Sequence, residues 1–218
     1  MTSLLASSTD VVLSRAAVAL DEPLVVDVEL LDDRECARAE RFLNGDDRAR
    51  YIGARAHLRR VLGERFGRPP GDVVLGSVGR GKPVVLGCDD VHFSLTHCGT
   101  TVVVAVADVP VGIDVESVRA GVWDLEMAAR VLSSAELDAV RASADPDREF
   151  FRAWTRKEAF AKVDGGGLVD QLASLTLLDS GPVPADGIWV SDVSMDRDLV
   201  LAVAVRATRP PRLRMQGR

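Results

Sequence analysis

The chain has 218 residues, 47% of them hydrophobic and 28% charged, which excludes a disordered protein and allows a buried core in one domain or in two small lobes. Its formal net charge of −6 and its isoelectric point of about 5.1 exclude the overall basic surface that is typical of nucleic-acid-binding proteins. Any affinity for an anionic partner must therefore come from local clusters of basic side chains.

The first twenty residues have no basic segment ahead of their apolar residues, and Asp10 and Arg15 interrupt them. They predict neither a signal peptide nor a membrane span, because no stretch approaches the roughly 18 uncharged apolar residues that a span needs. The three cysteines, Cys36, Cys88 and Cys98, lack the paired spacing of a metal site, and a small odd number of thiols indicates a reduced protein. We therefore expect a cytoplasmic protein.

Residues 24–31, LVVDVELL, predict a half-buried strand. Residues 33–67 predict two helices, with Asp32 or Asp33 as the first cap and a break at Asn44-Gly45. The second helix, over residues 46–66, has one apolar face, whereas its other faces are rich in arginine, most of which we expect to be solvated. The apolar positions are Tyr51, Ala54, Leu58, Val61 and Leu62; the arginines are Arg48, Arg50, Arg55, Arg59 and Arg60, with Arg38 and Arg41 just upstream.

Residues 79–83, GRGKP, predict a turn that leads into a strand, although a lone Gly-Lys-Pro usually marks only a turn. Residues 91–107 alternate as two strands around a turn at Cys98-Gly99. His97 stands at the end of the first of these strands. A lone histidine is more often a structural residue, but an imidazole held against phosphate oxygens would favour its charged form and donate a strong hydrogen bond.

Residues 109–117, VPVGIDVES, predict a short strand in which Asp114 and Glu116 project to the same side. Two adjacent carboxylates repel each other unless a cation lies between them, and hard oxygen ligands of this kind suit Mg²⁺. The alternative is a solvent-facing strand that carries two ordinary acids.

Residues 118–131 predict a loop and a short helix with exposed-looking apolar side chains at Trp123, Leu125 and Met127. Core packing is the usual role of such spacing, and a partner surface is the alternative. A further helix is predicted over residues 133–142, with Ser133 or Ser134 as its cap.

Residues 150–168 predict a helix on which Trp154, Glu158 and Lys162 share one face and which ends at the glycines 165–167. An exposed helix with an ordinary glutamate–lysine pair is the alternative. Taken with the two acids of the preceding strand, a third carboxylate and a lysine that can offset phosphate charge favour a site for a metal and a phosphate.

The last part of the chain shows strand patterns around Gly and Pro turns, followed by a basic tail that we expect to be poorly ordered. The order of strand, helices and strands occurs once before about residue 108 and again after it. The predicted strands cover residues 172–178, 188–193 and 199–205, and the tail covers residues 208–218.

Two strings in this chain resemble the signature motifs of a known family. GIDVE, residues 112–116, and WTRKEAFAK, residues 154–162, in this order and followed by a glycine-rich turn, closely resemble the motifs of the 4′-phosphopantetheinyl transferases of the surfactin type (Sfp type). The resemblance implies an α+β fold of two similar lobes, over residues 1–108 and 109–218, with the active site between them.

The implied reaction transfers the 4′-phosphopantetheinyl group of coenzyme A to a serine hydroxyl of an apo acyl or peptidyl carrier protein, and releases adenosine 3′,5′-bisphosphate. It requires Mg²⁺, with Mn²⁺ as a substitute, on Asp114, Glu116 and Glu158. Glu158 would also take the serine proton, directly or through a water. Lys162, together with Lys157, would offset the charge that grows on the leaving group.

In the resembled family, coenzyme A contacts segments of the first lobe, and the carrier protein meets the segment that corresponds to residues 118–131. The matching coenzyme A-binding positions are Arg38, Arg41, Arg50, Gly81, Lys82, Pro83, Thr96 and His97. This chain departs from the family at Glu35, where a lysine is expected. It departs again in the pattern F-N-x-S-H-S-G, in which Ser94, Thr96 and Cys98 replace the polar members.

Two other classes of protein fit part of the pattern. One is another Mg²⁺-dependent enzyme that acts on a nucleoside diphosphate derivative, which should show more acids on one helix than Glu158 alone. The other is a non-catalytic subunit that binds carrier proteins, although the presence of all the signature acids argues against it. A chain with both lobes supplies a complete site, so we expect a monomer without nucleic-acid or membrane partners.

Overall fold

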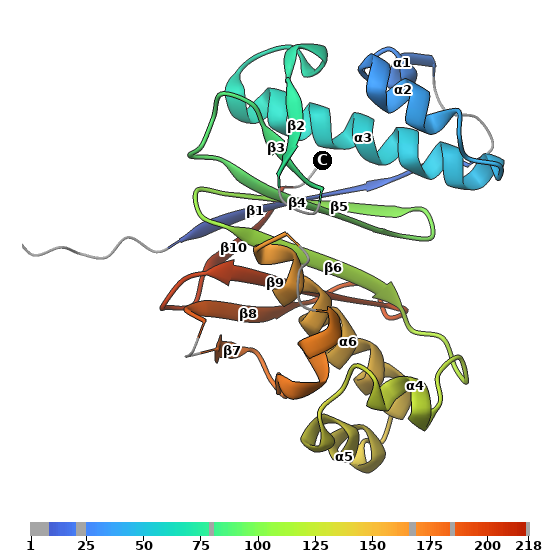
Figure 1. Cartoon of the computed structure of the whole chain (residues 1–218), viewed down its shortest axis with the longest axis vertical. Helices are drawn as coiled ribbons and strands as arrows, with labels where there is room; N and C mark the ends of the chain where they lie inside the picture. Colours follow the sequence, from blue (N-terminus) through green and yellow to red (C-terminus); the bar gives the residue numbers. More distant parts are fainter. Residues whose placement is uncertain (1–8, 21–24, 79–80, 166–168, 184–185, 217–218) are drawn as a thin grey trace, which may run out of the picture.

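The structure is a computed structural model that describes residues 9–20, 25–78, 81–165, 169–183 and 186–216. It confirms the predicted α+β class: within these residues the strands form two four-stranded sheets and one two-stranded sheet, and helices cover them (Figure 1). None of the helices in this described part combines the length and the apolar character that crossing a bilayer requires.

The N-terminal half of the chain, residues 9–107, is an antiparallel sheet covered on one face by the long helix α3. Its strands lie in the order β1-β5-β4, and Leu58 and Leu62 of α3 pack against Phe93 of β4. Its elements are β1 (Asp10–Ala17), α1 (Val25–Val28), α2 (Asp33–Ala39), α3 (Gly45–Phe66), the 3-10 helix η1 (Pro70–Asp72), β2 (Leu75–Val78), β3 (Lys82–Val85), β4 (His92–Cys98) and β5 (Thr101–Ala107).

The C-terminal half, residues 111–206, is a second antiparallel sheet covered by helix α6. Its strands lie in the order β6-β9-β8-β7, and Phe160 and Val163 of α6 pack against Val190 of β8. Its elements are β6 (Val111–Ser117), α4 (Leu125–Ala129), α5 (Ser134–Ala142), α6 (Pro146–Val163), the 3-10 helix η2 (Val169–Ser174), β7 (Gly181–Val183), β8 (Ile188–Val193) and β9 (Leu199–Arg206).

The two halves repeat one topology. In the first, a strand (β1), a long helix (α3) and a hairpin (β4 and β5) follow one another, and the last strand of the hairpin pairs with the first strand. In the second, β6, α6, β8 and β9 have the same order and the same pairing. The similarity of the two predicted lobes is therefore visible in the connection of their elements.

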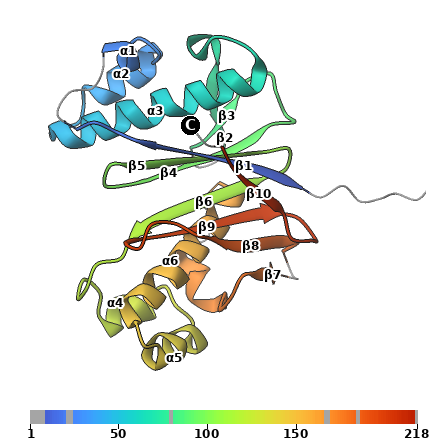
Figure 2. The ribbon, with the colours of Figure 1, turned by 180° about the vertical axis from the view of Figure 1, so that it is seen from behind.

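The two four-stranded sheets face each other, with α3 on the outside of one and α6 on the outside of the other (Figure 2). Leu13 and Val103 of the first sheet share one core with Ile113 and Val203 of the second. Burial of this shared core places β4 beside β6, so that residues on both strands meet where the halves join.

The predicted helix starts are confirmed by their caps. Asp32 accepts a hydrogen bond from the backbone nitrogen of Glu35 at 2.9 Å, and Asn44 caps α3 in the same way. Ser133 and Glu136 form a reciprocal capping box at the start of α5. These side chains satisfy amide groups that have no partner inside the helix, which is why the short polar residues mark the boundaries.

The predicted strand over residues 24–31 is wrong. Residues 25–28 form α1, and Leu24 lies outside the described residues. The carboxylate of Asp27 lies 2.5 Å from the guanidinium of Arg60, and Val25 is exposed. The segment is therefore held beside α3 by an ion pair rather than in a sheet by its apolar residues.

The predicted strand over residues 172–178 is also wrong. The segment begins in η2 and continues without regular structure. The carbonyl groups of Leu172 and Leu175 accept hydrogen bonds from the ammonium group of Lys157. Because a side chain of α6 satisfies these backbone groups, they take no part in a sheet.

The expected disorder of the C-terminal tail is wrong for residues 212–216. Strand β10 (Arg212–Gln216) pairs in parallel with β1, with Asp10 opposite Arg212 and Ser14 opposite Gln216. Residues 217 and 218 lie outside the described part. The last strand of the chain therefore belongs to the sheet of the N-terminal half, and β1 is an inner strand of that sheet rather than its edge.

Candidate active site

A pocket of about 640 Å³ lies between the N-terminal helices, the β2–β3 hairpin and the end of α6. Tyr51, Phe93 and Leu95 form apolar parts of its wall, and basic side chains outnumber acidic ones around it. Six of the predicted site residues line it: Arg38, Gly81, Lys82, Pro83, His97 and Lys162. Such a lining suits an anionic ligand that also has an apolar part.

Two predicted arginines lie outside this pocket. Arg41 lines a neighbouring cavity, which shares Arg34 and Arg38 with the main pocket. Arg50 is paired with two aspartates of its own helix, the nearer at 2.6 Å, but its Nε atom is buried without a hydrogen-bond partner in the described part of the chain. Where the two cavities adjoin, the basic side chains available to contact an anion are therefore those of Arg34 and Arg38.

His97 lies at the end of β4 and faces the pocket. Loss of water around its ring, and then the charges of Lys162 and Arg50, lower the pKa of His97 below its ordinary value of 6.5. The imidazole is therefore neutral at pH 7. It would take up a proton as a phosphate dianion approached, because a nearby negative charge favours the imidazolium form.

The acidic strand β6 lies against α6 because Gly112 lets the two backbones approach closely. A Cβ atom at Gly112 would lie 2.0 Å from a carbonyl oxygen of α6, so any other residue would push the strand away. Ile113 and Val115 are buried between the sheets, as their alternation predicts. Asp114 projects to the opposite side, where its Oδ1 atom accepts a hydrogen bond from Nζ of Lys162 at 2.6 Å.

Asp114 is almost fully buried, and its two oxygens have different surroundings. Oδ1 accepts a second hydrogen bond, from the hydroxyl of Thr96 at 3.1 Å, whereas Oδ2 is buried and has no partner in the described part of the chain. Burial raises the pKa of Asp114, while the charge and the hydrogen bond of Lys162 oppose this rise. A buried carboxylate oxygen without a partner is costly unless a cation or a donor reaches it.

Glu116 and Glu158 are half-buried carboxylates beside Asp114. Burial raises the pKa of each. The negative charge of Asp114 acts in the same direction on both, and the charge of Lys162 acts in the opposite direction on both. The charges of Asp114 and Lys162 therefore act on both glutamates, whereas the gathering of all three acids around one ion stays a prediction.

The donor set of this cluster fits Mg²⁺ in its chemistry. Within the described residues, no three His, Cys, Asp or Glu side chains stand close enough together to hold a metal ion as they are placed. The ammonium group of Lys162 occupies the position beside Asp114. The unpartnered Oδ2 atom is nevertheless a hard oxygen donor that a cation would satisfy. The assignment of Asp114, Glu116 and Glu158 to a metal therefore stays a prediction.

The predicted catalytic role of Lys157 is wrong. Its side chain is fully buried on the other side of α6, where Nζ lies 2.7 Å from Oε2 of Glu136 and donates to the carbonyl groups of Leu172 and Leu175. Adjacent residues of a helix point about 100° apart, so Lys157 cannot share the face of Glu158. It holds α5 and η2 against α6 instead.

The polar groups of Lys82 and Thr96, two of the predicted coenzyme A-binding residues, form hydrogen bonds with other groups of the protein. Nζ of Lys82 donates to three backbone carbonyl groups, and burial lowers its pKa. The Thr96 hydroxyl faces Asp114 and accepts a hydrogen bond from the backbone nitrogen of Val115 at 3.3 Å. Of the two, only Lys82 contributes to the pocket wall.

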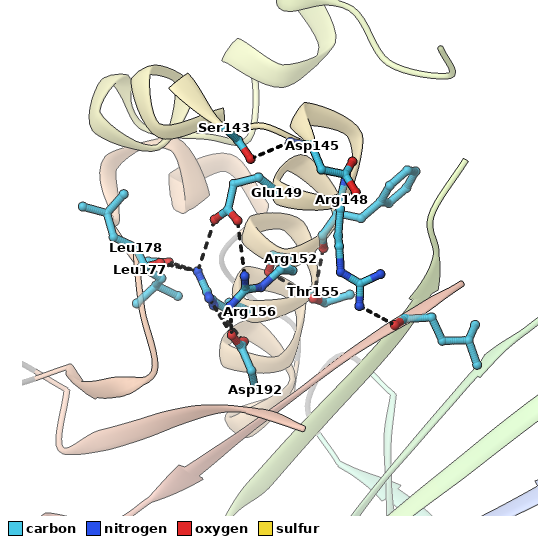
Figure 3. A network of polar contacts seen from close by, with 12 residues as sticks. Ser143, Asp145, Arg148, Glu149, Arg152, Thr155, Arg156, Leu177, Leu178 and Asp192 are labelled. Carbon is cyan, nitrogen blue, oxygen red and sulfur yellow. Dashed lines mark hydrogen bonds and ion pairs between the residues drawn. The ribbon is translucent and has the colours of Figure 1, made fainter. Parts of the chain in front are cut away.

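Helix α6 is anchored to β8 by an ion-pair network of residues that do not line the pocket (Figure 3). The guanidinium of Arg156 is buried and makes two contacts with Asp192, at 2.8 and 2.6 Å, and further contacts with the carbonyl groups of Leu177 and Leu178. Arg152 reaches the same carboxylate at 2.8 Å. This anchoring fixes the rotation of α6, and with it the direction in which Glu158 and Lys162 point.

Glu35 takes an unexpected position in the pocket. Its buried carboxylate is bound by the guanidinium groups of Arg55 and Arg59. Arg59 also pairs with Asp32 at 2.9 Å, so the two carboxylates together balance the charges of these two arginines. Arg34 and Arg38 are the basic residues of α2 that line the pocket. Arg34 was not predicted as a site residue, although its place four residues before Arg38 puts both on one helix face.

Fold and site together define a duplicated α+β protein in which a basic pocket leads to a cluster of acids on β6 and α6. A family model described as the 4′-phosphopantetheinyl transferase superfamily matches residues 110–199, which contain that cluster. The 4′-phosphopantetheinyl transferase HetI of a Nostoc species is 32% identical over 80% of this chain and 78% of its own length. The chain therefore belongs to the 4′-phosphopantetheinyl transferase superfamily, as its two motifs predicted.

Two further relatives have the same name. The 4′-phosphopantetheinyl transferase psf-1 of Bacillus pumilus is 37% identical over 64% of this chain, and a 4′-phosphopantetheinyl transferase of Bacillus subtilis is 32% identical over 67% of it. The matched part of this chain spans 60% and 66% of the lengths of these two relatives.

Proposed function

We propose that this protein transfers the 4′-phosphopantetheinyl group of coenzyme A to a serine hydroxyl of an apo acyl or peptidyl carrier protein. The observation that carries this proposal is the contact between Asp114 and Lys162, one from each signature motif, at the end of a basic pocket. A pocket of about 640 Å³ with basic and apolar walls can accept a nucleotide with its phosphates, which is the larger part of coenzyme A.

In this reaction the serine oxygen bonds to the outer phosphorus of the diphosphate, and the bond from that phosphorus to the bridging oxygen breaks. Adenosine 3′,5′-bisphosphate leaves with the electron pair, so negative charge grows on it. The ammonium group of Lys162 is the cation of the cluster that can offset this charge. Mg²⁺ held by Asp114, Glu116 and Glu158, or Mn²⁺ in its place, would neutralise the diphosphate charge.

Glu158 is the group that we assign to the serine proton. Its carboxyl group is half-buried, and burial raises its pKa above the ordinary value of 4.5, toward the pH at which a base works best. Asp114 is a poorer candidate, because its Oδ1 atom already accepts hydrogen bonds from Lys162 and Thr96.

We assign the adenosine part of the donor to the wall formed by Gly81, Lys82 and Pro83, and the 3′-phosphate to the basic end of the pocket. Arg38 and His97 line the pocket there, with Arg41 and Arg50 close by. The buried Nε atom of Arg50, which has no partner among the described residues, supports its place in this set. Thr96 takes a supporting role through Asp114 rather than a contact with the donor.

The carrier protein would meet the segment 118–131. Val122, Leu125 and Met127 are exposed there, whereas Trp123 stacks on Phe150 at 4.8 Å between ring centroids and belongs to the core. A small exposed apolar group suits a partner that binds and leaves.

We also infer a cytoplasmic monomer. The three cysteines are not paired in disulfides, and residues from both halves of one chain meet at the site. Sedimentation should give the mass of a single chain; an obligate trimer would contradict this inference.

Mass spectrometry tests the main proposal. An apo carrier protein incubated with coenzyme A, Mg²⁺ and this protein should gain the mass of one phosphopantetheinyl group on its serine. The same carrier with that serine changed to alanine is the matched control and should keep its mass. An unchanged mass with several carriers would favour a non-catalytic carrier-binding subunit instead.

A further inference from the structure

The chain uses lysine at very few positions. Of its 27 basic residues only three are lysines, namely Lys82, Lys157 and Lys162. Lys157 and Lys162 lie on α6, and the side chain of Lys82 contacts the end of the same helix. An ammonium group is compact and has three N–H donors, whereas a guanidinium group is a planar fork, so lysine suits places where several acceptors converge on one point.

Lys82 has such a set of acceptors. Its Nζ atom lies 3.1 Å from the carbonyl oxygen of Val111, 2.8 Å from that of Lys162 and 2.6 Å from that of Val163. The three acceptors match the three N–H bonds of the ammonium group. The last carbonyl groups of a helix lack the amide partner that the next turn would supply, and Lys82 donates to two of them. The carbonyl group of Lys162 also accepts from the backbone amides of Asp164 and Gly165, whereas Lys82 is the partner that joins this turn to β6.

These contacts join the two halves of the chain. Lys82 begins strand β3 of the N-terminal half, whereas its acceptors are the first residue of β6 and the last two residues of α6. Its stem passes close to Gly165, where a Cβ atom would lie 3.4 Å from Cβ of Lys82. Strand β6 and helix α6 carry the acids and the lysine of the site, so Lys82 acts on the backbone of both elements.

Lys162 connects this contact to the chemistry. Its carbonyl oxygen accepts a hydrogen bond from Lys82, while its own ammonium group lies 2.6 Å from Asp114. A last helical turn that frays would move the Lys162 side chain away from the carboxylate. The hydrogens of the Lys82 ammonium group are already used by carbonyl groups, which leaves none to bind a phosphate of the donor.

We propose that Lys82 is a positioning residue, which fixes the end of α6 against β6 and so holds Lys162 at the acid cluster instead of binding coenzyme A through its charge. The structural part of this proposal stands on its own. Its consequence for the rate rests on the proposed transferase function.

Hydrogen–deuterium exchange of the whole protein tests the structural part. In Lys82→Met, amides in residues 158–165 and 111–113 should exchange about ten times faster or more, because one charge-assisted contact of this kind corresponds to about ten- to a hundredfold. Lys82→Arg keeps the charge but lacks the convergent donors, and should show most of the same increase. Arg65→Met removes an exposed basic side chain of α3 without polar contacts in the described residues, and should show none. Unchanged exchange in both segments would overturn the proposal.

A double-mutant cycle tests the link to Lys162. Lys82→Met alone should lower kcat about tenfold or more, and in the Lys162→Met background the same change should have little further effect. Three results together would overturn the proposal: the loss is confined to KM for coenzyme A, Lys82→Arg restores it, and it adds fully to the loss from Lys162→Met. They would show that Lys82 binds coenzyme A through its charge. If the unaltered protein transfers nothing, the proposed function fails, while the exchange result still decides the role of Lys82.

Discussion

The hydroxyl group of Thr96 lies 3.1 Å from Oδ1 of Asp114 and 3.3 Å from the backbone nitrogen of Val115. One side chain of β4 thereby fixes both a carboxylate and the backbone of the acidic strand. Ser94, two residues earlier on the same strand, accepts a hydrogen bond from the backbone nitrogen of Ile113 at 3.2 Å. Two hydroxyl groups of the N-terminal sheet therefore accept hydrogen bonds from backbone amides of β6, as the carbonyl groups of a neighbouring strand would.

Thr96→Val should lower both stability and activity. The change keeps the shape of the side chain but removes a donor to Asp114 and an acceptor for a buried amide, which costs about 1–3 kcal/mol. The free energy of unfolding, measured with urea, gives the stability effect. Thr96→Ser keeps the hydroxyl group, loses only the methyl group and is the control; if Thr96→Val is no less stable than Thr96→Ser, the hydrogen bonds of the hydroxyl group do not have the role assigned to them.

Asp114→Ala and Glu158→Gln should respond differently to added metal. The first removes a ligand, so high Mg²⁺, or Mn²⁺ with its more tolerant coordination, should restore part of the activity. The second keeps one coordinating oxygen but cannot accept a proton, so a loss of about 10²–10⁴ in rate should persist at saturating metal. Rates near those of the unaltered protein for Glu158→Gln at high Mg²⁺ would show that Glu158 is not the base.

His97→Ala should raise KM for coenzyme A by about ten- to a hundredfold and leave KM for the carrier protein nearly unchanged. The scale is that of one charge-assisted hydrogen bond, about 1.5–3 kcal/mol. Dephospho-coenzyme A, which lacks the 3′-phosphate, should be a poor donor for the unaltered protein and lose little more in the variant. Equal use of both donors by the unaltered protein would remove His97 from the phosphate site.

Asp192→Asn should lower stability at neutral pH and have a smaller effect in acid. Burial alone would raise the pKa of Asp192, but hydrogen bonds from Arg156 and Arg152 outweigh it and lower the pKa below its ordinary value of 3.8. A carboxyl group with a lowered pKa in the folded protein stabilises it above the pKa of the unfolded chain, and this contribution is lost as the pH falls through the folded value. The expected difference at pH 7 is about 1.5–3 kcal/mol.

Urea unfolding at a series of pH values measures this effect. The difference between Asp192→Asn and the unaltered protein should be constant from neutral pH down to about pH 5 and should shrink below pH 4. Asp138→Asn, which removes an exposed carboxylate that pairs only with Arg141 in the described residues, is the control and should change stability little. A difference that grows in acid would contradict the role assigned to Asp192.

The contact between Asp114 and Lys162 could be predicted because the signals that place each residue are local. Alternation placed Asp114 on one side of a strand, and helical spacing placed Glu158 and Lys162 on one face. Their meeting followed from the resemblance of two short motifs to one family. The caps at Asp32, Asn44 and Ser133 were predictable for the same reason, since a cap bonds to amides two or three residues away.

Contacts between distant segments were not predictable from such patterns. The acceptors of Lys82 lie up to 81 residues away in the sequence, and Glu136 reaches the amide of Leu177, 41 residues away. Lys157 precedes Glu158 in a motif that resembles a catalytic one. Only the packing of α5, which brings Glu136 to Lys157, shows that the Lys157 side chain faces the interior. The sequence around Glu35 indicates only a partner of the helix cap, because its pairing with Arg59 depends on how α2 and α3 pack.

The pairing of β10 with β1 has a consequence for synthesis of the chain. A ribosome releases β1 first and β10 last, so the N-terminal sheet cannot be completed while the chain is still being made. Until then β1 presents a row of unpaired amide and carbonyl groups, which is the kind of edge that neighbouring chains can join. Nascent molecules on one messenger should therefore be most prone to associate just before residues 212–216 emerge, and a chain cut after residue 206 should keep that tendency permanently.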